Sequence, residues 1–178
     1  AAVMSATYHR PRAPVRPSYP RAMHVFMLAA VLLASQAQPS QPPSCSAPEH
    51  RQFDFWVGEW VVHGPKGGQA GTNRIEKVEN GCAIQENWTA ANGGTGRSIN
   101  FYEPVSKRWV QAWAGGGAVL LLQGGYDGEK MVMEGTSIGQ SGSVVRDRIT
   151  WSRLSPGKLR QFWEQSADGG KTWTVAFD

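Results

Sequence analysis

From Trp60 onward, hydrophobic and polar residues alternate in short segments that are separated by Gly, Pro, Asn and Asp. Alternation with a period of two is typical of β-strands, because successive side chains of a strand point to opposite faces. No stretch after residue 60 repeats its hydrophobic residues with the 3.6-residue period of a helix. We predict strands at residues 59–63, 73–78, 82–89, 97–103, 109–113, 119–123, 130–134, 144–152, 158–165 and 172–177.

The connections between these segments are short and carry residues that tolerate a positive φ, such as Asn80-Gly81 and Asp127-Gly128. Parallel crossovers need a dozen residues or more, so strands joined by such turns are antiparallel neighbours. Residues 48–55 are the one helical candidate, a turn or two ahead of the first strand. The chain is therefore predicted to be all-β, an antiparallel up-and-down β-barrel of about eight to ten strands with a short N-terminal helical turn.

The charge of the chain is unevenly distributed. The 178 residues have a formal net charge of +4, but before Cys45 there are four arginines and no Asp or Glu. Removing these four from the 18 Lys and Arg leaves 14, which equals the 14 Asp and Glu. All Gly and Trp residues follow Cys45, whereas most Pro residues precede it. We therefore expect a neutral folded domain, which argues against nucleic acid or an anionic membrane as its partner.

The first 37 residues have the order of an export signal, with a basic start, an apolar run at residues 25–34 and small residues at Ser35 and Ala37. This pattern predicts cleavage before Gln38. The apolar run has about half of the roughly 20 residues that a permanent membrane helix needs. We expect an exported protein, periplasmic or secreted, with no stable membrane span after processing.

Residues 38–48 form a polar, Pro-rich linker that precedes the predicted barrel domain at residues 49–178. Two cysteines in an exported chain usually pair, so we predict a disulfide between Cys45 and Cys82. Such a bond restricts the unfolded chain by about 4 kcal/mol in the entropic model. A lipid anchor on Cys45 is the alternative, although residues 42–44 lack the apolar residue that such a site prefers.

Residues 53–60 place a short helix before Gly58 and Trp60, which resembles the Gly-x-Trp motif at the first strand of lipocalins and of the wider calycin group. Residues 45–178, about three quarters of the chain, are similar to a family of exported bacterial lipocalin-like proteins of unknown function. That resemblance implies a barrel whose lumen can hold a small molecule, and it implies no assigned reaction. The matching pieces are FDFWVGEW, GCAIQENW, SINFYEP, RWVQAW and QSADGGKTW.

Residues 166–173 match the S-x-D-x-G-x-T-W Asp box of sialidases and other propellers, with Asp168, Gly170 and Trp173 as its central residues. The side chains of such a box bind turn amides, and its Trp packs beneath the hairpin. Propellers repeat the box from blade to blade, whereas this chain has one copy. We interpret it as a hairpin-stabilising turn and not as a sign of a glycosidase.

Three predicted strands place Trp beside Gln or Glu on one face. If these faces point inward, they form an amphipathic cavity in which Glu86, Gln111 and Gln161 orient a ligand and an arginine supplies a counter-charge. The alternative is that the tryptophans pack on the outer surface or fill the barrel. The candidate lumen residues are Glu86, Trp88, Trp109, Gln111, Trp113, Arg148, Gln161 and Trp163.

The sequence carries no pattern of a known catalytic or metal site. His50 and His63 belong to neither H-x-E nor H-E-x-x-H, and no Gly-x-Ser-x-Gly elbow is present. Haem is not expected, because no His follows His63 and the late soft ligands are only Met131 and Met133. We predict no catalytic residue, no metal and no cofactor.

The leading hypothesis is a protein that binds an unknown small, partly apolar ligand without catalysis. A second is a cavity enzyme, an isomerase or hydrolase, in which burial adapts Glu86 for acid–base chemistry. A third is an envelope protein-interaction module whose outer tryptophans bind a partner. The identity of the ligand and the oligomeric state stay open.

Overall fold

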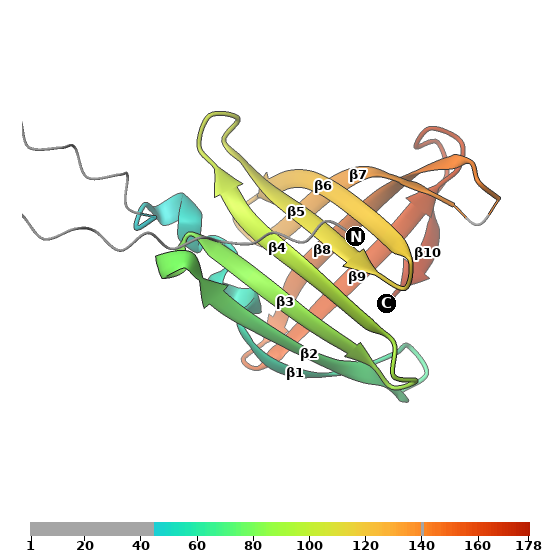
Figure 1. Cartoon of the computed structure of the whole chain (residues 1–178), viewed down its shortest axis with the longest axis horizontal. Coiled ribbons are helices and arrows are strands. Elements are labelled where there is room, and N and C mark those ends of the chain that lie inside the picture. The colour runs from blue at the N-terminus through green and yellow to red at the C-terminus, as the bar shows by residue number, and fades with distance from the viewer. Residues whose placement is uncertain (1–44, 140) are drawn as a thin grey trace, which may run out of the picture. The chain divides into compact units, whose positions relative to one another are not determined.

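The structure is a computed structural model and describes residues 45–139 and 141–178. The predicted leader and all but the last residues of the linker lie outside this part. Within it, ten strands form one sheet in which every strand pairs antiparallel with the next strand of the chain (Figure 1). This confirms the predicted all-β, up-and-down architecture. The strands are β1 Gly58–His63, β2 Gln69–Val78, β3 Ala83–Ala90, β4 Thr95–Glu103, β5 Arg108–Gly115, β6 Ala118–Tyr126, β7 Lys130–Ile138, β8 Val144–Ser155, β9 Lys158–Ser166 and β10 Thr174–Phe177.

The sheet curls into a half-barrel with a concave, buried face. Close approach of neighbouring strands accompanies the curl, because a Cβ on Gly124 of β6 would overlap the carbonyl oxygen of Val132 on β7. In the described part of the chain, β1 pairs only with β2, and β10 only with β9. A seam therefore separates the two edge strands. The four-residue β10 pairs with β9 at residues 163–165 and leaves the start of β9 without a partner on this side.

Two turns of 3-10 helix, η1 at Pro48–Arg51 and η2 at Asp54–Trp56, precede β1. They stand where the sequence predicts a short helix. Phe53, fully buried, stacks on Trp56 with 4.8 Å between ring centroids and meets Trp151 edge-on at 5.2 Å. Trp60 of β1 donates a hydrogen bond from its Nε1 to the backbone oxygen of Trp56, at 2.8 Å. This aromatic plug, Phe53 and Trp56, packs into the core of the half-barrel.

The predicted disulfide is present, with Cys45 bonded to Cys82. Cys82 caps η3, the 3-10 turn Glu79–Gly81 that leads into β3. Within this turn both Asn80 and Gly81 have positive φ, as the Asn-Gly signal indicates. The bond therefore ties the segment before η1 to the start of a central strand.

All ten strands differ from the predicted bounds by one to four residues at one or both ends. Two of these differences have a local reason. β2 begins at Gln69 and not at residue 73, because Gly71 continues the strand beneath the indole of Trp88. β10 begins at Thr174 and not at residue 172, because the backbone amide of Thr172 donates to the Asp168 carboxylate and leaves the ladder.

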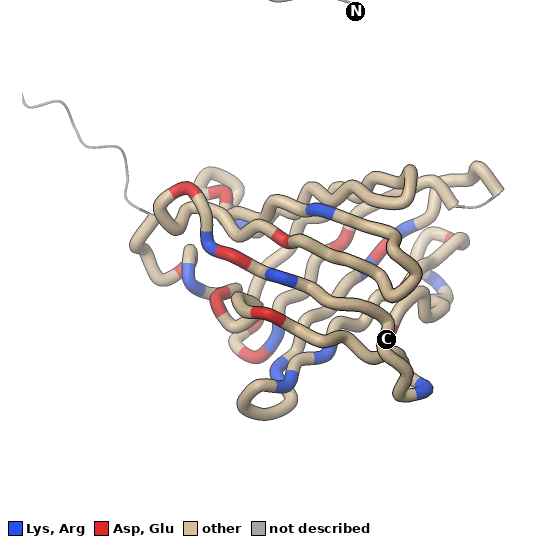
Figure 2. The backbone as a smooth tube through the Cα atoms, turned by 60° about the horizontal axis from the view of Figure 1, so that its bottom comes forward, with Lys and Arg blue, Asp and Glu red and all other residues tan. Residues whose placement is uncertain are grey.

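No helix in residues 45–139 and 141–178 is long and apolar enough to cross a bilayer. Along the tube of Figure 2, Lys and Arg positions are interspersed with Asp and Glu positions. The surface charge is thus mixed in sign over the described strands.

Candidate functional site

A cavity of about 130 Å³ opens on the concave face of the half-barrel. It brings together most of the candidates from the sequence, which come from β3, β5 and β9. These are Glu86, Trp88, Gln111, Trp113, Gln161 and Trp163. The rest of its lining consists of Val62, Asn73, Leu120, Ile149, Trp151 and Phe177.

Glycines opposite two of the tryptophans make room for their indoles. Trp113 lies across Gly96 of β4, where a Cβ would come within 2.7 Å of the indole Cζ2. Trp88 lies across Gly71 of β2 in the same way, with 2.5 Å to its Cη2. Real Cβ atoms do not approach other atoms so closely, so both indoles can take these positions only beside glycine.

A chain of hydrogen bonds crosses the sheet beneath the cavity. Asn73 of β2 donates from Nδ2 to Glu86 Oε1 at 2.7 Å, and Ser98 of β4 donates from Oγ to Glu86 Oε2 at 2.8 Å. Asn100 donates from Nδ2 to Ser98 Oγ at 2.9 Å. Gln111 of β5 then donates from Nε2 to Asn100 Oδ1 at 2.7 Å. Side chains of four neighbouring strands hold the Glu86 carboxyl in one position.

Glu86 is the buried acid of the cavity, with 5% of its surface exposed. Burial raises its pKa above the ordinary value, because the charged form loses hydration. The hydrogen bonds from Asn73 and Ser98 and the positive charge of Arg97 oppose this effect and only partly offset it. Among the described residues, no Lys, Arg or His forms an ion pair with Glu86.

The concave face holds two acceptor oxygens that have no hydrogen-bond partner in the described part of the chain. One is Oδ1 of Asn73, whose side chain lines the cavity. The other is Oδ2 of Asp147 on β8, which is fully buried. The second oxygen of Asp147 accepts hydrogen bonds from Trp163 Nε1 and Gln165 Nε2, both at 2.9 Å.

A larger hollow of about 550 Å³ runs along the seam between β1 and the β8–β9 hairpin. Its lining includes Trp56 and Trp60, so it reaches the aromatic plug. The hollow and the cavity share part of their walls, and the seam therefore offers a route from solvent to the cavity. The shared residues are Val62, Asn73, Gln161 and Phe177.

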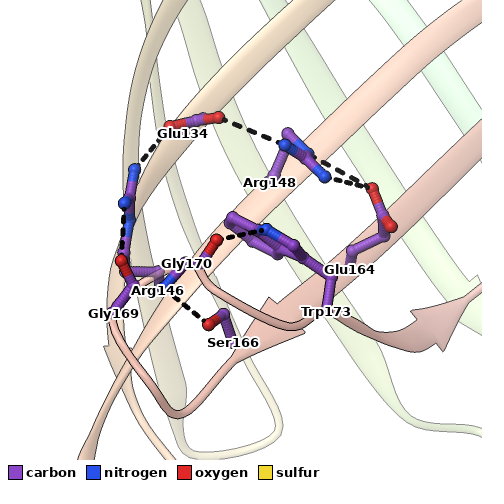
Figure 3. Close-up of polar contacts among 8 residues, drawn as sticks. All are labelled: Glu134, Arg146, Arg148, Glu164, Ser166, Gly169, Gly170 and Trp173. Carbon is purple, nitrogen blue, oxygen red and sulfur yellow. Dashed lines mark hydrogen bonds and ion pairs between the residues drawn. The ribbon is translucent and has the colours of Figure 1, made fainter.

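Arg148 lies on the outer face of β8, so the expectation that it lines the lumen is wrong. Alternation along β8 turns Asp147 inward and Arg148 outward. Its guanidinium lies 4.0 Å from the ring centroid of Trp173 and pairs with Glu164 at 3.0 Å and with Glu134 at 3.8 Å (Figure 3). The counter-charge expected inside the lumen is therefore on the opposite surface.

Trp109 points inward but does not line the cavity, which corrects its placement among the lumen candidates. It is 1% exposed and meets Phe53 edge-on with 5.6 Å between ring centroids. Its Nε1 donates to Gln52 Oε1 at 3.2 Å. Trp109 thus supports the aromatic plug, two residues before Gln111 on the same strand.

The Asp-box residues form the connection between β9 and β10. Asp168 accepts hydrogen bonds from Ser166 Oγ at 2.7 Å and from Thr172 Oγ1 at 2.6 Å. Ser166 Oγ in turn accepts from the amide of Gly170 at 2.8 Å. Trp173 donates from Nε1 to the Gly170 oxygen at 3.1 Å and packs under the turn (Figure 3). These local contacts serve the turn, and none reaches the cavity.

The tryptophans are distributed unevenly between the two faces of the sheet. Trp173 is the tryptophan that packs on the outer face, and Arg148 covers its ring. The other seven are buried or line the concave hollows: Trp56, Trp60, Trp88, Trp109, Trp113, Trp151 and Trp163.

Several functional positions were missed by the sequence interpretation. Asn73 is the first residue of the strand predicted at residues 73–78, and it is not among the candidate lumen residues. Ser98 and Asn100 alternate with outward residues on β4, so the period-two pattern carried a usable signal. Trp151 shares the inner face of β8 and donates from Nε1 to Gln161 Oε1 at 3.0 Å. An inward-facing polar cluster was therefore detectable, although its convergence on Glu86 was not.

The described residues contain no group of three His, Cys, Asp or Glu side chains that could hold a metal ion. No protein-family model matches the chain, and no curated protein matches its sequence.

Proposed function

We propose that this protein binds a small, partly apolar molecule in the cavity on the concave face of the half-barrel. The observation that carries the proposal is the convergence of four tryptophans with Asn73, Glu86, Gln111 and Gln161 around one space of about 130 Å³. Flat apolar walls with a few fixed polar groups are typical of ligand sites. The volume is similar to that of a buried protein cavity of about 150 Å³ that accommodates benzene.

The apolar and the polar residues of the lining have different roles in binding. Trp88 and Trp113 pack closely against glycines of the neighbouring strands and present indole surface to the cavity, which favours stacking on a planar or cyclic ligand. The polar chain that ends at Glu86 fixes hydrogen-bonding groups before a ligand arrives, which lowers the entropy lost on binding. A longer ligand extends from the cavity into the hollow along the seam.

Quenching of intrinsic tryptophan fluorescence by fatty acids, aromatic compounds and saccharides tests this function. The matched variants are Trp113→Leu, which changes the cavity, and Trp173→Leu, which makes the same change in the β9–β10 connection. We expect the first to weaken binding of the best ligand and the second to leave it unchanged. A flat response of the wild-type protein to every compound would overturn the proposal.

We also propose that the protein is exported and related to lipocalin-like barrels. The disulfide between Cys45 and Cys82 and the helical turn before Gly58 and Trp60 support this proposal, together with the up-and-down strand order. Disulfides persist mainly in oxidising compartments. Intact mass measured after expression in a bacterium tests it, with an expected chain that begins at Gln38 and carries one disulfide. A full-length chain with two free thiols in the cytoplasm would contradict it.

A second candidate function is acid–base catalysis by Glu86 in the same cavity. The raised pKa of this carboxyl favours it, because burial brings the pKa of a carboxyl closer to the range in which it can act as an acid or a base. Chromatographic separation followed by mass spectrometry of each bound ligand after incubation distinguishes the two functions, because it detects both hydrolysis and an isomerisation that leaves the mass unchanged. A ligand that is converted by the wild-type protein and bound but not converted by Glu86→Gln would establish catalysis, and unchanged ligands would exclude it.

A further inference from the structure

The cavity is acidic and has no basic residue to balance it. Among the described residues that line it, Glu86 is the only ionisable side chain. Asp147, the other buried carboxyl of the concave face, accepts hydrogen bonds from Trp163 and Gln165 and does not line the cavity. Neither carboxyl forms an ion pair within residues 45–139 and 141–178. Such an environment attracts positive charge.

The remaining walls are suited to an organic cation. Indole is the aromatic ring that attracts a cation most strongly over its face, and the attraction grows when water is excluded. The lining presents four indoles, from Trp88, Trp113, Trp151 and Trp163. Arginine already uses the one indole of the outer face in this way, at 4.0 Å from the ring of Trp173.

Two kinds of hydrogen-bond acceptor are still free around Glu86. Asn73 is 6% exposed, lines the cavity, and has an Oδ1 without a partner in the described chain. Each oxygen of Glu86 accepts only one side-chain hydrogen bond, so a second lone pair is left on each. A ligand that donates two or three hydrogen bonds would satisfy these groups, and a ligand that only accepts would not.

From this geometry we infer that the ligand is a small organic ammonium ion, a protonated amine carried on a cyclic or aromatic body. This inference rests on the proposed binding function and names the chemical class of its ligand. The ammonium group donates to the Glu86 carboxylate and to Asn73 Oδ1, and the apolar body packs against the indoles.

Protonation of Glu86 is coupled to the binding of such a cation. An ammonium ion beside Glu86 stabilises the carboxylate, so binding lowers the pKa that burial raises in the free protein. The charged groups nearest to Glu86 on the neighbouring strands are Arg74 and Glu76 of β2 and Arg97 of β4, and the buried Asp147 belongs to β8. Arg74 pairs with Glu76 on the outer face, and Arg97 donates to backbone oxygens. None of them neutralises Glu86 inside the cavity.

Isothermal titration calorimetry with three ligands of nearly equal size tests the inference. Benzylamine is a cation at pH 7, benzyl alcohol is neutral and benzoate is an anion. The full chain is compared with Glu86→Gln and with the control Glu129→Gln, which removes the same charge from the exposed turn between β6 and β7. Circular dichroism confirms that each variant is folded.

We expect the wild-type protein to bind benzylamine about tenfold or more tightly than benzyl alcohol, and benzoate most weakly. Glu86→Gln should abolish the preference for the amine and leave the alcohol within about twofold, whereas Glu129→Gln should keep the preference. The affinity of the wild-type protein for benzylamine should also fall as the pH is lowered, because protonation of Glu86 removes its charge, whereas the affinity for benzyl alcohol should not. These two wild-type results decide the inference even if Glu86→Gln does not fold.

The failure of this inference is distinct from the failure of the proposed function. Equal or tighter binding of benzyl alcohol or benzoate, or an amine preference that persists in folded Glu86→Gln, would overturn the inference and leave ligand binding intact. If none of the three compounds binds while another compound of the fluorescence panel does, the inference again fails alone. If no compound of the fluorescence panel binds either, both the inference and the proposed binding function fail.

Discussion

Replacing Phe53 with alanine tests the argument that the helical turns before β1 complete the core. Phe53 lies outside any strand, yet its side chain is fully buried. Its ring contacts Phe55, Trp56, Trp109 and Trp151, with centroid separations between 4.8 and 5.6 Å. Without this ring, the aromatic plug loses the side chain that joins η2 to β5 and β8.

The magnitude follows from the buried area. A fully buried Phe removes about 150–200 Å² of mostly apolar surface from water, which stabilises the fold by about 4 kcal/mol at ~25 cal/mol per Å². The typical loss for Phe→Ala in a core, about 3–5 kcal/mol, agrees with this value. For a domain of this size, the loss lowers Tm by about 10–15 °C.

Thermal unfolding followed by circular dichroism, together with denaturant titration, measures the effect. Phe162→Ala is the matched control, because Phe162 lies on the outer face of β9 under the Arg160 guanidinium, 4.4 Å from its ring centroid. We expect the control to lose about 1 kcal/mol. If Phe53→Ala costs no more than Phe162→Ala, the turns do not close the core and the reasoning is refuted.

Three further perturbations follow from the same structure. Replacing both Cys45 and Cys82 by serine removes a covalent link across 37 residues and should lower the free energy of unfolding by about 4 kcal/mol. An unchanged midpoint of denaturant unfolding would contradict this prediction. Gly96→Ala should displace the Trp113 indole, cost about 1–3 kcal/mol and change the near-UV circular dichroism, whereas an unchanged spectrum would show that the indole does not lie on Gly96. The hydrogen bonds from Thr172 and Ser166 lower the pKa of Asp168 in the folded protein. Its carboxylate therefore stabilises the folded state at a pH above about 4, the pKa in the unfolded chain, and this stabilisation is lost as the pH falls below that value. Asp168→Asn should therefore lose less stability than the wild-type protein between about pH 5 and 2, and parallel pH profiles would contradict the assignment.

The strand order could be predicted because each piece of it is a local property. Short turns such as Asn80-Gly81 force antiparallel neighbours, and alternation along each segment defines its two faces. The Cys45–Cys82 bond could be predicted as well, since two cysteines allow one intramolecular pairing. The boundaries of β2 and β10 could not, because they depend on contacts with Trp88 and Asp168 from beyond the strands themselves.

The candidate site was predictable only in part. Alternation along a strand shows which residues share a face. On this basis the prediction correctly grouped Glu86 with Trp88 and Gln161 with Trp163. This alternation does not show which face of the sheet is concave, and this is why Arg148 was assigned to the lumen although it lies outside. It also does not give the position of a residue along the barrel axis. Trp109 shares a face with Gln111 but lies against the plug.

By itself, the sequence determined the fold class, the antiparallel strand order, the disulfide and the neutral charge of the part after Cys45. All of these depend on residues close together in the chain or on simple counts. Only the tertiary structure decided which strand faces converge, because the curl of the sheet brings side chains from distant strands around one space. That curl puts Glu86 among indoles in a cavity whose lining contains no basic side chain, and the chemistry of the cavity follows from this placement.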